Sequence, residues 1–168
     1  APYYPRALEA FQYEGEQLAL PETFSTVLLF YNADLFDEAG LDYPSADWTW
    51  DDAAAAAETI TAMGDDVWGL YSPTQFWEFY KKAAQNGECQ FFNEDMTEST
   101  INSPACVSTL EMMTGWMDSG IMPTQAQLSG VSDSELFLSG NLGMLVTGIW
   151  MFGAFTDADF NWDVQIEP

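Results

Sequence analysis

Short apolar runs with the length of β-strands alternate with amphipathic segments along this chain, and this alternation limits the fold more than any other feature. Strand character is found at 24–32, 67–71 and 142–147, and in the alternating Trp162, Val164 and Ile166. Between them, helical periodicity or capping residues mark the segments 33–39, 49–63, 76–86, 104–119 and 132–139. Strands that alternate with helices predict an α/β fold.

The charge of the chain is strongly one-sided. Three Lys and Arg residues stand against 27 Asp and Glu residues, which gives a net charge of −24. Nucleic acids and anionic membrane surfaces are bound through clusters of Lys and Arg, so we expect neither as a partner. Hydrophobic residues make up 48% of the chain, which indicates a folded domain. No apolar run approaches the roughly 20 residues of a membrane-spanning helix.

Several kinds of chemistry are missing from the sequence. The chain has no histidine, which excludes Ser-His-Asp and Cys-His nucleophiles and removes the commonest transition-metal ligand. Two cysteines without histidine cannot build an ordinary zinc site, and the chain has no glycine-rich phosphate loop, so we expect no metal and no cofactor. Glycoside hydrolysis needs only two carboxylates, and neighbouring acids occur at 51–52, 94–95 and 157–159. A carbohydrate-active enzyme using paired carboxylates therefore remains the alternative to a binding protein, and an acidic structural domain without a ligand is a third possibility.

Two tryptophans follow predicted strands, where open α/β folds bind ligands. Trp77 and Glu78 lie in the first turn of a helix after the strand 67–71. Trp77 is one step, about 100°, around that helix from Phe76 on the apolar stripe, so we expect Trp77 and Glu78 to point away from the main core face. Trp150 follows the strand 142–147, just past Gly148, which is placed like a hinge. If both strands run parallel in one sheet, the two indoles form one ligand wall, and Glu78 accepts hydrogen bonds. Flat aromatic rings suit the apolar faces of sugars, although most tryptophans serve core packing.

The order of short motifs along the chain resembles family 1 of the extracellular solute-binding proteins, which includes the maltodextrin-binding protein. The matching stretches lie at 15–36, Glu38–Leu41, Trp48–Ala53, Asn102–Ala105, Ser119–Pro123 and Phe137–Trp150. The resemblance implies one lobe of a periplasmic-binding-protein-like fold, with a mixed sheet flanked by helices. In such a fold two α/β lobes close on a sugar and deliver it to an ABC importer. It implies an extracellular or periplasmic location, no enzymatic activity, and permease subunits as partners. We expect a monomer that meets the membrane only through a lipid anchor outside this chain.

The resemblance also divides the chain and selects site residues. It implies a tail and hinge-proximal segment over 1–22 and a C-terminal-type lobe over 23–168, with the first lobe and the C-terminal end lying outside the chain. It places sugar-stacking aromatics at Trp150 and at either Phe76 or Trp77, and leaves the identity and length of the sugar open. Cys89 and Cys106 lie 17 positions apart, a spacing that permits either redox state. Secretion, which the resemblance implies, favours a disulfide between them.

Overall fold

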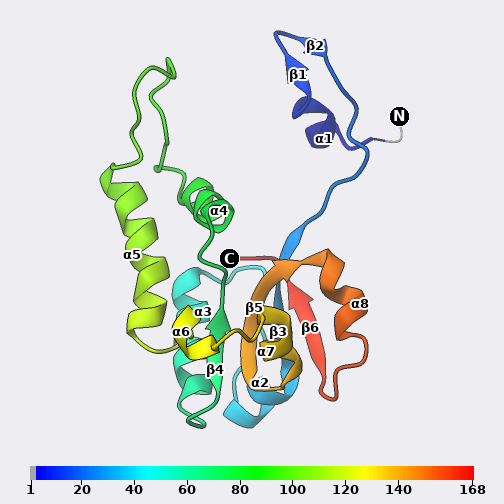
Figure 1. Ribbon diagram of the computed structural model, residues 1–168, viewed down its shortest axis with the longest axis vertical. Coiled ribbons are helices and arrows are strands. Elements are labelled where there is room, and N and C mark those ends of the chain that lie inside the picture. The colour runs from blue at the N-terminus through cyan, green and yellow to red at the C-terminus, as the bar shows by residue number, and fades with distance from the viewer. Residues whose placement is uncertain (1–2) are drawn as a thin grey trace.

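A mixed four-stranded sheet forms the centre of the computed structural model, which describes residues 3–168 (Figure 1). The strands are β3 (Val27–Asn32), β4 (Trp68–Tyr71), β5 (Leu142–Gly148) and β6 (Trp162–Gln165), in the spatial order β4-β5-β3-β6. β4 is parallel to β5, whereas β3 is antiparallel to both β5 and β6. The predicted α/β class with a mixed sheet is therefore confirmed.

Three strands end at the same edge of this sheet. Because β3 runs against β5, its first residue Val27 pairs with Gly148, the last residue of β5. β6 also runs against β3, so the segment that follows Gln165 leaves at that edge as well. The helix after β4, the turn after β5 and the C-terminal segment after β6 consequently start close together. The sequence argument for Trp77 and Trp150 depended on β4 and β5 being parallel, and they are.

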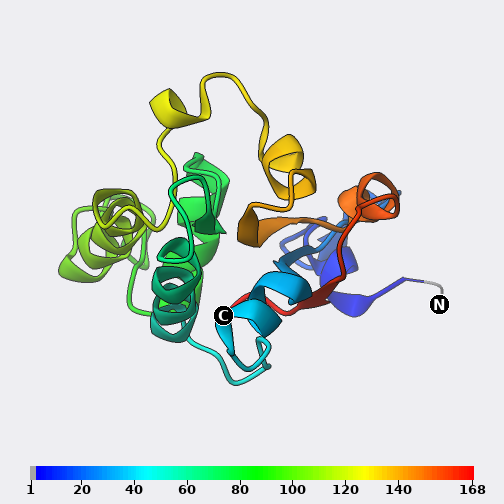
Figure 2. The same ribbon diagram turned by 90° about the horizontal axis from the view of Figure 1, so that it is seen from below.

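Helices cover both faces of the sheet. α2 (Ala33–Ala39) and α3 (Trp50–Thr61) lie on one face, and α7 (Asp133–Leu138) and α8 (Phe152–Phe155) lie on the other (Figure 2). α3 approaches β4 closely because Gly69 has no side chain, and a Cβ at this position would overlap the backbone of Ala57. The central strands are apolar on both faces, and β5 is buried along its whole length.

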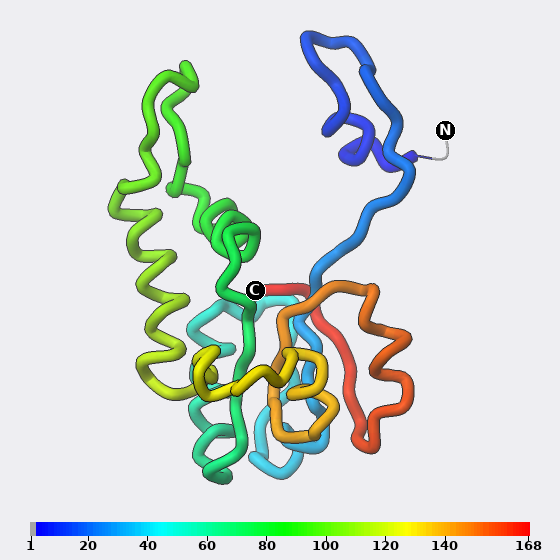
Figure 3. The backbone as a smooth tube through the Cα atoms, viewed as in Figure 1, coloured from blue at the N-terminus to red at the C-terminus, as the bar shows by residue number. Residues whose placement is uncertain are grey.

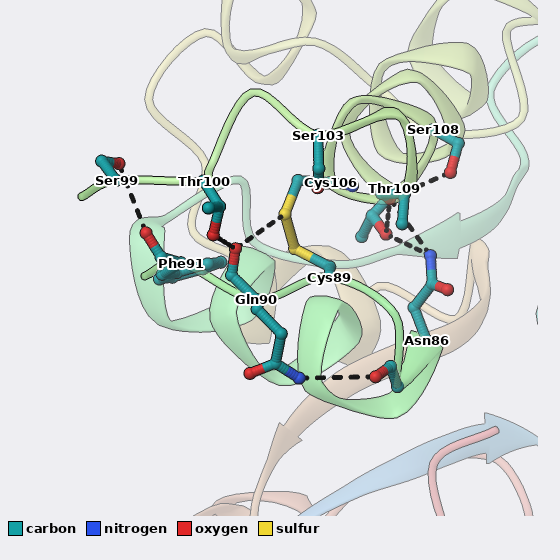
Figure 4. Close-up of a disulfide and its surroundings, with 12 residues drawn as sticks. Asn86, Cys89, Gln90, Phe91, Ser99, Thr100, Ser103, Cys106, Ser108 and Thr109 are labelled. Carbon is teal, nitrogen blue, oxygen red and sulfur yellow. Dashed lines mark hydrogen bonds between the residues drawn. A yellow bond between two sulfur atoms is a disulfide. The ribbon is translucent and has the colours of Figure 1, made fainter. Parts of the chain in front are cut away.

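A disulfide-linked arm and an N-terminal unit extend away from the sheet. α4 (Phe76–Asn86) and α5 (Pro104–Asp118) form the arm with the loop between them, and the short α6 (Gln125–Leu128) follows. Cys89 and Cys106 are joined by a disulfide that ties this loop to α5 (Figure 4). α1 (Pro5–Glu9), β1 (Gln12–Tyr13) and β2 (Glu16–Gln17) stand apart on an extended segment (Figure 3). The C-terminus lies between the arm and this unit, at the edge where β6 ends.

The apolar face predicted for α4 is wrong in part, because, of Phe76, Phe79, Tyr80, Ala83 and Ala84, only Ala83 is buried and Phe79 is half-buried. Phe76 and Tyr80 are 64% and 56% exposed, although their rings contact Phe91 at 5.8 and 5.5 Å between centroids. The helix buries Glu78 and Lys82 together with Ala83. The physical reason is that α4 packs on α5 and on the C-terminal segment, where paired charges replace an apolar stripe.

Periodicity predicts an apolar stripe of Val107, Leu110, Met113 and Met117 on α5, and this prediction is wrong in part. Met113 is buried as predicted, whereas Val107 and Leu110 are 42% and 50% exposed, and the helix also buries Cys106, Thr109 and Trp116. Over residues 3–168, no helix combines the length and apolar character needed to cross a membrane.

Candidate functional site

Trp77, Glu78 and Trp150 line a single pocket at the edge where β4 and β5 end. The pocket has a volume of about 220 Å³. Trp77 and Trp150 are 59% and 61% exposed, so both indoles are free to contact a ligand. The other lining residues are Val27, Pro73, Gln75, Lys81, Asp133, Val146, Thr147 and Met151. An open hollow with two flat aromatic rings and a few polar groups suits a ligand with both apolar faces and hydroxyls.

Strand ends and turns set the positions of the two tryptophans. Trp77 lies in the first turn of α4, which begins after Gln75 as its N-cap. Trp150 lies in the 3₁₀ turn η1 (Ile149–Met151), which begins directly after β5. The backbone N–H of Ile149 donates to the carbonyl of Thr26 at 3.0 Å, and this bond fixes the turn to the start of β3. Gly148 does not line the pocket but lies beside the Trp150 ring.

Phe76 lies outside this pocket. Its ring contacts Phe91 of the disulfide loop, and it takes no part in the lining that Trp77 and Trp150 share. Of the two aromatic residues that the sequence left open, Trp77 is therefore the one that the structure places beside Trp150.

The expectation that Glu78 points away from the protein interior is wrong. Only 3% of the residue is exposed, although it forms part of the pocket wall. Its Oε2 atom lies 2.9 Å from Nζ of Lys81 and 3.1 Å from Nζ of Lys82. The two ammonium groups offset the energetic cost of burying this carboxylate. Burial of an isolated charge at this depth would strongly destabilise the fold.

Glu167 completes this group of charges from the C-terminal segment. Its Oε2 lies 3.0 Å from Lys81 Nζ, and its Oε1 lies 3.0 Å from Lys82 Nζ. Lys82 is fully buried at its side chain, and its Nζ lies 4.5 Å from the centre of the Trp50 ring. We call Glu78, Lys81, Lys82 and Glu167 the ion cluster. Sequence reasoning missed it, although Lys81 and Lys82 are the only lysines in the chain and offered a signal.

Charged and titrating groups elsewhere have structural roles. The Thr49 hydroxyl and backbone N–H hydrogen-bond Asp52 and lower the pKa of its carboxyl, and Ser132 does the same for Glu135. Asp52 of the pair at 51–52 is thereby committed to a helix cap. Within residues 3–168, no group of three His, Cys, Asp or Glu side chains is arranged to hold a metal ion.

Comparison with known proteins identifies the class to which this architecture belongs. The family described as bacterial extracellular solute-binding protein matches residues 1–168. An ABC substrate-binding protein from Listeria monocytogenes, solved in complex with cycloalternan, is 50% identical and superposes with a TM-score of 0.88. The match covers 98% of this chain and 42% of that protein. A cyclic α-maltosyl-1,6-maltose binding protein from Arthrobacter globiformis is 28% identical, with a TM-score of 0.73 and coverages of 95% of this chain and 41% of that one.

A further relative is named for a different solute. The sn-glycerol-3-phosphate-binding periplasmic protein of Brucella abortus is 28% identical over 161 residues, which cover 92% of this chain and 37% of that protein. The chain thus spans less than half the length of each of these relatives. The match over the whole chain confirms the predicted resemblance to solute-binding proteins.

Proposed function

The chain belongs to the bacterial extracellular solute-binding protein family, and from this membership we propose that it forms one lobe of a carbohydrate-binding protein that serves an ABC importer. The observation that carries the proposal is the pocket in which Trp77 and Trp150 present exposed indoles beside Glu78. Sugar rings have flat C–H faces that pack on such indoles, and their hydroxyls donate to carboxylates. The 50% identical relative, solved with cycloalternan, supports the same class of ligand.

The proposal assigns parts of the chain to parts of the mechanism. Residues 1–22 form a tail and hinge-proximal segment, and residues 23–168 form the lobe. Trp77 and Trp150 stack on the sugar, and Gly148 gives Trp150 its place. Closure of a second lobe over this pocket completes the site, as a population shift driven by ligand contacts to both lobes. The isolated lobe consequently binds the sugar only weakly.

The proposed setting follows from the same family. The protein acts outside the cytoplasmic membrane, as a monomer, and passes its cargo to the permease subunits of the importer. A lipid anchor outside this chain is its only link to the membrane. It has no enzymatic activity in this proposal, because the chain belongs to a family of binding proteins and the buried carboxylate of Glu78 is paired with two lysines.

Tryptophan fluorescence tests the proposal. The full-length protein is titrated with uncharged mono- and oligosaccharides, including maltose and cycloalternan, and with sn-glycerol 3-phosphate. We expect a saturable change in emission with one saccharide class, and no product when the mixtures are analysed after long incubation. Saturation by sn-glycerol 3-phosphate alone would contradict the proposal, and cleavage of a saccharide would favour the enzyme alternative.

A further inference from the structure

Positive charge is scarce in this chain and is concentrated at one place. Its three cationic side chains are Arg6, Lys81 and Lys82. Arg6 lies in α1 and pairs with Glu9 at 3.2 Å. Lys81 and Lys82 both lie in α4, one turn after Trp77, and Lys81 lines the pocket. Any cation that this chain offers to a ligand in the pocket is therefore Lys81, with Lys82 behind it.

Both lysines are already neutralised on two sides. Lys81 Nζ lies 2.9 Å from Glu78 and 3.0 Å from Glu167, and Lys82 Nζ lies 3.1 Å and 3.0 Å from the same two residues. The ion cluster thus contains two ammonium groups and two carboxylates, and its formal charge is zero. Glu167 does not line the pocket, so its effect on a ligand runs through the lysines.

A phosphorylated ligand would find no net positive charge on this wall. Recognition of a phosphate requires charge-assisted hydrogen bonds from Lys, Arg or backbone N–H groups. Lys81 has a third N–H donor to offer, but a phosphate bound there would lie close to the two carboxylates that Lys81 already pairs with, at 2.9 and 3.0 Å from its Nζ, and they would repel it. The first turn of α4, another place at which an anion could bind, already carries Glu78, and Asp133 also lines the pocket.

We infer that Glu167 is a specificity-determining residue, which cancels the charge of Lys81 and Lys82 so that the pocket accepts uncharged saccharides and rejects phosphorylated ones. The inference rests on the proposed function and narrows its ligand class. Removal of the Glu167 charge leaves one unit of positive charge in the ion cluster, directly behind the pocket wall.

The experiment replaces Glu167 by the isosteric glutamine in the full-length protein. Glucose 6-phosphate, inorganic phosphate and cycloalternan are titrated by calorimetry into the wild type, Glu167→Gln and the control Glu58→Gln. Glu58 is an exposed carboxylate of α3 outside the pocket, so its loss changes the net charge equally. We expect glucose 6-phosphate and phosphate to bind Glu167→Gln about tenfold more tightly than the wild type, the effect of one charge-assisted hydrogen bond. This gain should fall as sodium chloride is raised and be absent in Glu58→Gln.

A second variant and a folding check guard against misfolding as the cause of a negative result. Glu78→Gln frees the same lysines from the other side and should also gain anion affinity, and circular dichroism checks that each variant is folded. Two outcomes would overturn the inference: a wild type that binds glucose 6-phosphate as tightly as uncharged saccharides, or folded Glu167→Gln and Glu78→Gln variants that gain no more than Glu58→Gln. A wild type that binds no uncharged saccharide would refute the proposed function, while a gain of anion binding in Glu167→Gln would still support this role of Glu167.

Discussion

The indole ring of Trp150 fills the space that a side chain on Gly148 would need. A Cβ built on residue 148 would overlap the Cζ3, Cη2 and Cε3 atoms of that ring. The backbone of Gly148 is extended, with φ −93° and ψ 161°, so any residue could adopt its conformation. Residue 148 is therefore a glycine because the Trp150 ring occupies the space beside it. The absence of a side chain lets this ring fold back over the end of β5 toward the pocket.

Gly148→Ala should displace Trp150 and weaken saccharide binding while the fold survives. Loss of one aromatic contact corresponds to about 1 kcal/mol, so we expect an affinity lower by about fivefold. Calorimetric titration of the full-length protein measures the change. Gly153→Ala is the matched control, because a Cβ on residue 153 meets no atom within 4 Å. Equal affinities in both variants would show that the ring position does not matter for binding.

Trp77→Ala and Trp150→Ala should each lower saccharide affinity by about tenfold, because each removes one of the two exposed indoles of the pocket. Phe76→Ala serves as the comparison. It removes an exposed aromatic residue of the same helix that lies outside the pocket, and its effect should stay within about twofold. Calorimetry suits all three variants, since two of them alter the intrinsic fluorescence. A larger loss for Phe76→Ala than for Trp77→Ala would move the stacking role to Phe76.

Much of the fold follows from local features of the sequence. The Thr49 cap, the left-handed Gly40 at the end of α2 and the apolar run of β5 each lie within a few residues of the feature that they determine. The edge shared by Trp77 and Trp150 followed from one further assumption, that β4 and β5 are parallel.

The ion cluster could not be predicted in the same way. Glu167 and Lys81 are 86 positions apart, and what brings them together is the direction of β6 in the sheet. Periodicity also misled the reading of α4, since an apolar stripe is expected to face the core, whereas Phe76 and Tyr80 face the disulfide loop. Long-range pairing and the choice of packing partner lie beyond what local patterns determine.

Lys82→Met should lower the free energy of unfolding by about 3–5 kcal/mol, because it leaves Glu78 and Glu167 buried with a single remaining cation. Urea denaturation measures the loss. The double variant Lys82→Met/Glu78→Gln removes one carboxylate as well and should recover part of the stability. Additive losses in the double variant would contradict the coupling of Lys82 to Glu78.

The two capping boxes that contain a carboxylate, at Thr49–Asp52 and Ser132–Glu135, should contribute to acid sensitivity. Hydrogen bonds from Thr49 and Ser132 lower the pKa of Asp52 and Glu135 in the folded state. A lowered folded-state pKa means that these carboxylates stabilise the fold above their unfolded pKa values and lose this effect as the pH falls through the folded values. Asp52→Asn and Glu135→Gln should therefore flatten the acid side of a stability-versus-pH curve measured in urea. Glu58→Gln, at an exposed position of α3, is the control that should leave the curve unchanged.

The disulfide should stabilise the arm without shaping the pocket. It closes a loop with a sequence separation of 17, for which chain entropy predicts about 3 kcal/mol of stability. The double variant Cys89→Ala/Cys106→Ala should lose about this amount in urea denaturation, and its amide exchange should rise in the loop between α4 and α5 and not in β5. Saccharide affinity should persist, because the ion cluster holds the first turns of α4 in place without the disulfide. The disulfide lies beyond the C-terminal end of α4. A variant that stays folded but loses saccharide binding would show instead that the arm positions Trp77.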